Sequence, residues 1–262
     1  MEKDEKELTP SWKRCEESVA ASKQSFEAAF SEKFFYNRQT RDNSHIEAIL
    51  KILPVKSDMR ILDLGTGSGY LAFALATKYP DVTVIGLDIV ENALEQNKLS
   101  ARRNRLGNIS FLSYNGISLP FENGSFDMVV SRYALHHFPV ISMTLSEVNR
   151  ILACNGCFFV SDPTPNPDDM NGFIDEYMKV KPDGHIRFRS FSEWSTICEN
   201  SGFQIAGSFK SFIRFPRKYE EIYASIINRY PKEIVSGYDI KIREDEIFIT
   251  EQVTNILFRK GI

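Results

Sequence analysis

The sequence predicts an α/β protein built on a doubly wound, mostly parallel sheet, and three observations carry this prediction. Short strands alternate with helices through the middle of the chain. The strands are apolar on both sides, as in residues 82–87 (VTVIGL), which is typical of a strand that helices cover on both faces. A glycine-rich turn joins the first strand directly to the next helix, as at the ligand sites of doubly wound folds.

The elements of this core have local reasons to form. Pro54 ends the first helix. Glu91 and Glu95 near the start of the third helix, and Gly107 after its end, suit the helix dipole and a glycine C-cap. In chain order, the expected elements are helix 43–53, strand 59–64, helix 69–79, strand 82–87, helix 91–106, strand 108–113, strand 126–131, helix 140–152 and strand 157–161.

The segments on either side of this core break the alternation. Residues 8–42 read as helical and end in an aromatic run, Phe34-Phe35-Tyr36, and residues 163–187 carry four prolines. Further on, we expect helix 190–201, strand 203–210, helix 217–229 and a segment 246–258 that fits a strand or a strand followed by a helix, with a strand favoured. The expected organisation is an N-terminal helical lid segment, 1–42, and one domain, 43–262, with insertions at 163–187 and 211–245.

Composition excludes several classes of protein. The 32 basic and 35 acidic residues give a net charge of −3, which argues against a partner as acidic as nucleic acid. No apolar run reaches the roughly 18–20 residues that span a bilayer, and the charged N-terminus lacks the apolar stretch of a signal peptide. Four scattered cysteines do not make a disulfide scaffold, so we expect a cytoplasmic protein.

Cys154 and Cys157 have the spacing C-x-x-C, which is found in redox and metal sites. A second pair of ligands or a thioredoxin-like setting is missing from the sequence, and Asn155-Gly156 is a strong turn signal. We therefore predict a turn that leads into the strand at 157–161, and no metal site.

The turn after the first strand reads Asp63-Leu64-Gly65-Thr66-Gly67-Ser68-Gly69. Glycines allow a tight turn and a close approach of a ligand to the backbone, and the helix that follows directs N–H groups at that ligand. The spacing differs from the dinucleotide fingerprint G-x-G-x-x-G, because the third glycine comes one residue early. Asp88, at the end of the second strand, can accept hydrogen bonds from ribose hydroxyls, and its structural alternative is a helix N-cap.

Three stretches together resemble the class I S-adenosylmethionine-dependent methyltransferases: ILDLGTGSGY, VIGLDI and NGISLPFENGSFDMVVSRYALHHF. The third stretch resembles the ubiquinone/menaquinone C-methylase-like, small-molecule branch of that family. The resemblance covers residues 43–162, with a weaker echo to about 210. It implies a seven-stranded Rossmann-like sheet with a helical N-terminal lid and C-terminal additions, S-adenosylmethionine as cofactor and S-adenosylhomocysteine as product.

The resemblance also implies roles for residues at the carboxyl ends of the strands. Asp63 would anchor the amino end of the cofactor, Asp88 the ribose hydroxyls, and Ile89 would pack on the adenine. Asn115 stands where the family often has aspartate at the adenine amino group, and an Asn carbonyl also accepts a hydrogen bond. The expected cofactor-binding set is Asp63, Leu64, Gly65, Thr66, Gly67, Ser68, Gly69, Asp88, Ile89, Asn115, Gly116 and Ser131.

The methyl acceptor needs a base if it loses a proton, and histidine is the commonest base. His136 and His137 follow the fourth strand, where a packing role and a chemical role both stay open, and His45 reads as structural. His185 lies in a His-x-Arg that resembles a pocket-facing motif of related small-molecule methyltransferases. We take His137 and His185 as catalytic candidates. The expected substrate pocket also contains Tyr36, Arg41, Tyr133, His136 and Arg187.

The expected function is methyl transfer from S-adenosylmethionine to an oxygen, nitrogen or carbon atom of a small molecule by in-line displacement. Two alternatives stay open: a methyltransferase that acts on RNA or protein, and a regulatory protein that binds the cofactor without transfer. Enzymes that methylate exocyclic amines of bases resemble one another in an Asn/Asp-Pro-Pro-aromatic turn, and Ser131-Arg132-Tyr133-Ala134 contains no proline.

Overall fold

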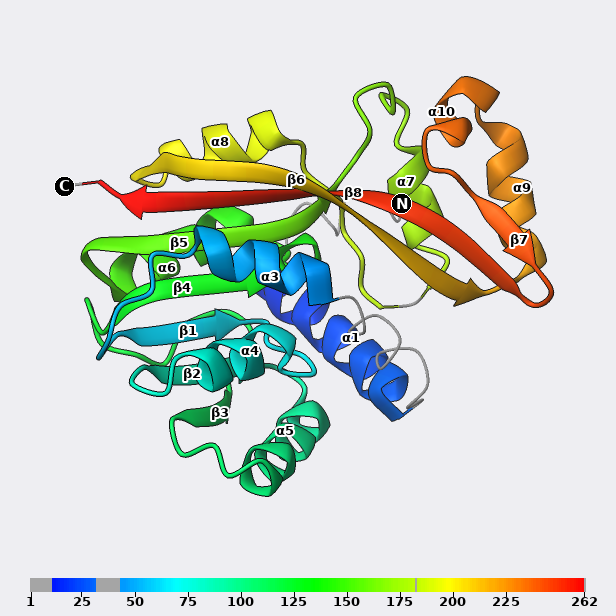
Figure 1. Ribbon diagram of the computed structural model, residues 1–262. Coiled ribbons are helices and arrows are strands. Elements are labelled where there is room, and N and C mark those ends of the chain that lie inside the picture. Colours follow the sequence, from blue (N-terminus) through cyan, green and yellow to red (C-terminus); the bar gives the residue numbers. More distant parts are fainter. Residues whose placement is uncertain (1–10, 32–42, 182, 262) are drawn as a thin grey trace.

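The protein is described by a computed structural model over residues 11–31, 43–181 and 183–261. Its centre is a sheet in the order β3-β2-β1-β4-β5-β8-β6, with β7 paired to β8 (Figure 1). β1 to β5 are parallel, and β8 runs antiparallel to both β5 and β6. The strands are β1 (Arg60–Leu64), β2 (Thr83–Asp88), β3 (Ile109–Ser113), β4 (Phe126–Arg132), β5 (Leu152–Thr164), β6 (Phe203–Lys218), β7 (Lys241–Arg243) and β8 (Glu246–Lys260).

The expected α/β class and doubly wound sheet are confirmed, and the short β7 adds an eighth strand to the seven that were expected. The helices are α1 (Ser11–Ser31), α3 (Asn43–Ile52), α4 (Tyr70–Lys78), α5 (Glu91–Arg103), α6 (Ile141–Ile151), α7 (Phe173–Met178), α8 (Phe191–Glu199), α9 (Glu221–Arg229) and α10 (Lys232–Ser236), with a 3-10 turn η1 (Leu135–His137). Among the helices that the structure describes, none is both long enough and apolar enough for a membrane crossing.

Helices cover both faces of the sheet, as its apolar strands require. One buried core joins the sheet to α3, α4 and α5, and a second core joins it to α6 and α8. Side chains alternate along a strand, so neighbouring residues serve opposite cores. On β1, for example, Ile61 packs in the first core and Leu62 in the second.

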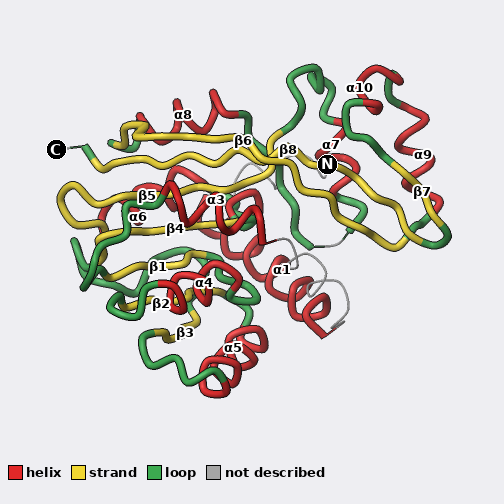
Figure 2. The backbone as a smooth tube through the Cα atoms, in the orientation of Figure 1, coloured by secondary structure: helices red, strands yellow, loops and turns green. Residues whose placement is uncertain are grey.

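β6 and β8 continue past the other strands as a two-stranded ribbon. β8 pairs with β5 only over residues 252–259, whereas its pairing with β6 continues to Lys218 and Glu246. α7, α9, α10 and β7 gather around this extension (Figures 1 and 2). Their buried side chains form what we call the cap cluster: Phe173, Ile174, Tyr177, Met178, Phe188, Tyr223, Ile226, Tyr238, Ile247 and Ile249.

The ribbon corrects several expectations. The strand expected at 203–210 extends to Lys218, and the helix expected at 217–229 begins only at Glu221. Pairing with β8 holds the whole length of β6 extended, and local sequence does not reveal that partner. Segment 246–258 is a strand throughout, as favoured, and the proline-rich 163–187 contains the unpredicted helix α7.

Two smaller predictions can also be compared with the fold. α1 accounts for part of the helix expected at 8–42, while Phe34, Phe35 and Tyr36 lie outside the described residues. Cys154 and Cys157 are unpaired, and Asn155 between them has φ 62°. The predicted turn is wrong, because β5 already begins at Leu152 and both cysteines lie within it; the pairing of β4 with β5 only shifts its register at this point.

We predict that Ile249→Ala destabilises the protein, because Ile249 is fully buried in the cap cluster. The expected loss is about 2–5 kcal/mol in the free energy of unfolding, measured by denaturant titration. The matched control is Ile222→Ala on α9, where the side chain is 51 % exposed and the change should be below about 0.5 kcal/mol. Equal losses in the two variants would show that the cap cluster is not a packed core.

Candidate functional site

A buried carboxylate holds the glycine-rich turn between β1 and α4. Asp63 Oδ2 accepts hydrogen bonds from Thr66 Oγ1 at 2.7 Å and from Ala72 N at 3.1 Å, so it joins the turn to the start of α4. Burial raises the pKa of Asp63 to about 6, although both hydrogen bonds lower it. Gly65 and Gly67 have φ of 71° and 49°, a left-handed backbone that glycine adopts without strain. The turn is therefore fixed before any ligand binds.

Asp88 is the last residue of β2 and is buried. Its Oδ2 accepts from Gly67 N at 2.7 Å and its Oδ1 accepts from Val90 N at 3.0 Å. Burial raises its pKa, and the backbone hydrogen bonds act in the opposite direction. The N-cap of α5 is Val90, so Asp88 does not take the capping role that was its structural alternative. A carboxylate has about four lone-pair positions, so Asp88 keeps capacity to accept from ligand hydroxyls.

α1 forms a wall of the same site. Val19 packs against the turn that follows β3, where a Cβ on Gly116 would come within 2.4 Å of Val19 Cγ1. Lys23 Nζ joins α1 to α5 through an ion pair of 2.9 Å with Glu91. Phe26 meets the ring of His137 edge to face, with ring centroids 4.8 Å apart. One helix thus contacts both ends of the site.

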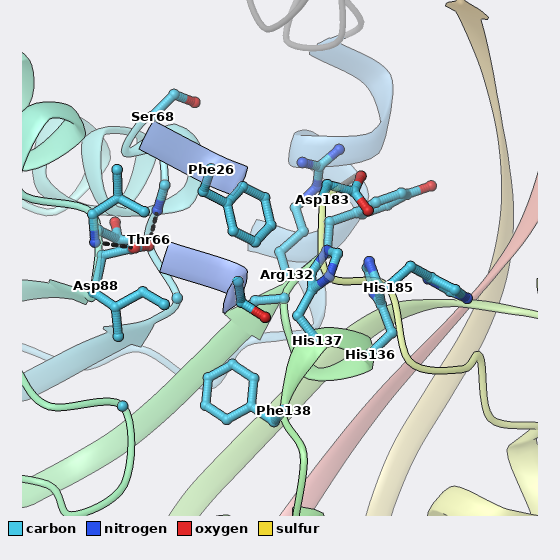
Figure 3. A pocket seen from close by; sticks show the side chains of 18 of the residues that line it. Phe26, Thr66, Ser68, Asp88, Arg132, His136, His137, Phe138, Asp183 and His185 are labelled. Atoms are coloured by element: carbon cyan, nitrogen blue, oxygen red, sulfur yellow. Dashed lines mark hydrogen bonds between the residues drawn. The ribbon is translucent and has the colours of Figure 1, made fainter. Parts of the chain in front are cut away.

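A single cavity runs from the glycine turn to the cap cluster. In Figure 3, Thr66, Ser68 and Asp88 lie at one end, His136, His137, His185 and Asp183 lie at the other, and Phe26 lies between them. Of the expected cofactor residues, the following line this cavity: Asp63, Gly65, Thr66, Gly67, Ser68, Asp88, Ile89 and Gly116.

The other expected cofactor residues lie off the cavity and support it. Leu64 is buried in the core under α6, and Gly69 precedes α4 as its N-cap. Ser131 Oγ donates to Leu64 O at 2.8 Å, which links β4 to β1. Asn115 is exposed, and its Oδ1 accepts from the backbone N–H groups of Ile117 and Ser118. The structure therefore gives Asn115 a turn-forming role, and the neighbouring Gly116 faces the cavity instead.

Three histidines from two segments of the chain meet at the other end of the cavity, which we call the acceptor end. The ring centroid of His136 lies 4.0 Å from that of His137 and 5.4 Å from that of His185. His45, by contrast, lies on α3 outside the cavity and bonds Asn255 Oδ1 at 3.2 Å. The structure thus brings together His136, His137 and His185, which the sequence places in two segments.

Two of these histidines have carboxylate partners. His136 Nδ1 lies 2.8 Å from Asp162 Oδ1, and His185 Nε2 lies 2.8 Å from Asp175 Oδ1. Burial lowers the pKa of His136 well below its usual value and raises that of Asp162 to about 7, because desolvation disfavours charge on both groups. Burial, and then the neighbouring His136, lower the pKa of His137 to about 3. The histidines that face the cofactor end are therefore neutral near pH 7.

Four charged residues of the acceptor end form what we call the charged wall: Lys181, Asp183, Arg217 and Glu251. Arg132 also lines the cavity, with its guanidinium over the ring of Tyr133. Lys181 Nζ lies 3.5 Å from Asp183 Oδ2. Arg217 Nη2 contacts Met178 Sδ at 2.6 Å, and its guanidinium lies over the ring of Tyr177. Burial raises the pKa of Glu251 to about 7, which outweighs the opposite effect of Arg217.

Of the remaining residues expected in the substrate pocket, some line the cavity and others do not. Tyr133 lines the cavity beside the charged wall, and Tyr36 and Arg41 lie outside the described residues. Arg187 is exposed and forms an ion pair with Glu193, so the structure places it outside the cavity. Phe188, the next residue, turns inward and packs on His185.

Several residues of the site were missed from sequence. Asp162 could have been found, because it lies near the carboxyl end of β5, and ligands of doubly wound folds bind at that edge of the sheet. Arg217 and Glu251 carry no such signal, because only the β6–β8 pairing brings them to the cavity. Val19 and Phe26 read only as apolar residues of a helix.

The residues at the cofactor end fit S-adenosylmethionine chemically. Asp88 offers buried carboxylate oxygens for the ribose hydroxyls, and Ile89, Val19 and Gly116 provide apolar surface on which a flat base can pack. The backbone of Gly65 and Gly67 faces the cavity without side chains. Within the described part of the chain, no group of three or more His, Cys, Asp or Glu residues is placed to hold a metal ion.

Comparison with known proteins agrees with this geometry. Residues 55–205 match the family model described as "Methyltransferase domain". The chain is 29 % identical to the uncharacterized methyltransferase YcgJ of Bacillus subtilis over 150 residues, which are 57 % of this chain and 58 % of YcgJ. It is 41 % identical to the demethylmenaquinone methyltransferase of Lactococcus lactis subsp. lactis over 110 residues, which are 40 % of this chain and 44 % of that protein. The matched stretches span about half the length of these relatives.

The crystal structure of YcgJ has the same fold. It superposes with a TM-score of 0.73 and 23 % identity, over 84 % of this chain and all of that chain. At this level of identity the likeness concerns the fold.

We predict that Asp88→Asn weakens the binding of S-adenosylhomocysteine about tenfold to a hundredfold, since it removes a charged acceptor worth about 1.5–3 kcal/mol. Isothermal titration calorimetry measures this change. The matched control is Asp127→Asn on β4, which also removes an acceptor of a backbone N–H, that of Arg60, but lies off the cavity. Unchanged affinity in Asp88→Asn would exclude Asp88 from the binding site.

We also predict a pH-dependent effect of Glu251→Gln. The pKa of Glu251 in the folded protein, about 7, lies above its ordinary value of 4.5. Its contribution to stability is therefore fully present below about pH 4.5 and is lost as the pH rises through 7. The stability of wild type relative to the variant should fall by on the order of 3 kcal/mol between these limits. Thermal unfolding across this pH range measures the stability difference between wild type and variant, and the exposed Glu221→Gln is the control. A difference that does not change with pH would contradict the raised pKa of Glu251.

Proposed function

Because the chain belongs to the class I S-adenosylmethionine-dependent methyltransferases, we propose that it methylates a small molecule bound at the acceptor end of the cavity. The chain is a methyltransferase, and S-adenosylmethionine is its methyl donor. One observation supports a small acceptor: the acceptor end is lined by buried histidines and by the cap cluster residues Met178 and Phe188. The demethylmenaquinone methyltransferase among its relatives is likewise named for a small-molecule acceptor.

The cavity brings donor and acceptor together. S-adenosylmethionine supplies an electrophilic methyl group bound to a sulfonium sulfur. The leaving group is the neutral thioether S-adenosylhomocysteine. Asp88 and the glycine turn hold one end of the cavity rigid, while α1 and the cap cluster close around the other. Holding two reactants in line at about 3–3.5 Å can supply roughly 7–11 kcal/mol of a barrier. Positioning is thus the main contribution of the chain.

His136 is placed to take a proton from the acceptor. A hydroxyl, an amine or an activated carbon loses a proton when it is methylated, and Nδ1–H of His136 donating to Asp162 leaves Nε2 as the basic nitrogen. Because burial raises the pKa of Asp162 to about 7, Asp162 is ionised above that pH, and its carboxylate then stabilises the imidazolium that forms. We therefore assign proton removal to His136 rather than to the initial candidates His137 and His185.

His137 and His185 take other roles in this scheme. His137 Nδ1 is buried without a hydrogen-bond partner among the described residues, so it is free to bond the acceptor. His185 is held by Asp175 of α7, which also accepts from Phe188 N at 2.7 Å. It therefore fixes the cap cluster to the histidines and acts as a positioning residue.

Transfer of label from methyl-tritiated S-adenosylmethionine tests the proposal. The protein is incubated with a cell extract, which is then separated into small molecules, protein and RNA. Label in the small-molecule fraction, lost in Asp88→Asn, is the expected result. Label in protein or RNA would support the alternative class of acceptor, and cofactor binding with no transfer would support a regulatory protein; either result contradicts the proposal.

We predict that His136→Gln and Asp162→Asn each lower kcat, by about 10²–10⁴-fold in the case of the histidine, which matches the usual contribution of a general base. The affinity for S-adenosylhomocysteine should stay unchanged, because neither side chain lies at the cofactor end. Steady-state rates with the labelled acceptor, together with calorimetry, separate the two effects. The control is His45→Gln, a buried histidine outside the cavity, and an equal loss there would point to a general structural role.

A further inference from the structure

The residues of the charged wall indicate which functional groups the methyl acceptor carries. This inference rests on the proposed function. Four polar atoms of cavity-lining residues are buried and have no hydrogen-bond partner among the described residues: Tyr133 Oη, His137 Nδ1, Asp183 Oδ1 and Arg217 Nη1. An unpaired buried polar atom is costly, and such atoms are rare in folded proteins. Their gathering in one cavity indicates a ligand that pairs with them.

A ligand that pairs with these four atoms needs both donors and acceptors. Arg217 Nη1 can only donate, and Asp183 Oδ1 can only accept as a carboxylate. Tyr133 Oη can do both, and His137 Nδ1 donates or accepts according to the tautomer. A hydroxyl group both donates and accepts, so several hydroxyls on one molecule satisfy the set. An apolar tail satisfies none of it.

Above the pKa of Glu251, about 7, the four charges of the wall are balanced. Lys181 and Arg217 oppose Asp183 and Glu251, and the nearby His136 and His137 are neutral because burial lowers their pKa. Arg132, a further cation that lines the cavity, interacts with the carboxylates of Asp63 and Glu251. A carboxylate on the acceptor would lie beside two like charges, and an ammonium would lie beside two others, in a site with little water to screen them. The wall therefore favours a neutral ligand.

Aromatic rings complete the acceptor end. Phe188 and Phe215 line it together with Phe26 of α1, and Phe188 packs edge to face on both His136 and His185. Rings on these sides provide flat apolar contacts around the polar wall. We infer that the acceptor is a compact, neutral molecule with several hydroxyl groups, and that Arg217 and Asp183 select it.

A matched set of three probes tests this inference. Methyl gallate is a neutral ring with three hydroxyls, gallate is the same ring with a carboxylate, and methyl benzoate lacks the hydroxyls. Each is titrated calorimetrically into protein saturated with S-adenosylhomocysteine at about pH 8, above the pKa of Glu251. We expect methyl gallate to bind at least about tenfold more tightly than either counterpart, as the hydrogen bonds to charged groups imply.

Variants locate the selectivity. Asp183→Asn and Arg217→Met should each weaken methyl gallate about tenfold and leave the affinity for S-adenosylhomocysteine unchanged. The control is Arg214→Met on the same strand, whose side chain pairs with Asp239 away from the cavity. If Arg217→Met does not fold, Asp183→Asn decides the question alone.

The outcomes are separate from those of the proposed function. Three outcomes would each overturn the inference. Gallate or methyl benzoate could bind as tightly as methyl gallate, methyl gallate could fail to bind, or its affinity could stay the same in Asp183→Asn. In all three cases S-adenosylhomocysteine still binds, and the methyltransferase assignment stands. Failure of S-adenosylhomocysteine to bind would instead contradict the cofactor site itself.

Discussion

Parallel pairing of β1, β2, β4 and β5 brings the carboxyl ends of these strands to one edge of the sheet, and the site depends on that constraint. Asp63, Asp88 and Asp162 lie at or near the ends of their strands, and all three are buried. Burial disfavours their charge, so each must be held by hydrogen bonds. These bonds come from the glycine turn, the start of α4 and His136, which are the parts that contact a ligand.

The β6–β8 ribbon adds the second half of the site. Because both strands continue past β5, they carry the cap cluster beyond the edge where the cofactor end lies. Arg217 on β6 and Glu251 on β8 belong to the extended part and reach the cavity from there. The same pairing that stabilises the cap therefore also sets the chemistry of the acceptor end, while the cofactor end depends on the parallel strands alone.

This division explains what the sequence could predict. The glycine turn and Asp88 are local signals, since a strand, a turn and a helix follow one another within a few residues, and the structure places both at one cavity. The acceptor end is assembled from strands far apart in the chain, so the Asp162 partner of His136 and the charged wall were missed. The adenine contact that the resemblance implies for Asn115 stays a prediction, and the structure shows its side chain bonded to its own turn.

A crystal structure with S-adenosylhomocysteine bound tests most directly whether one cavity holds the cofactor at the strand ends and points it at the histidines. We expect ribose hydroxyls bonded to Asp88, the adenine packed on Ile89, and the thioether sulfur facing His137. A cofactor with its ribose away from Asp88, or with its sulfur directed away from the acceptor end, would contradict it.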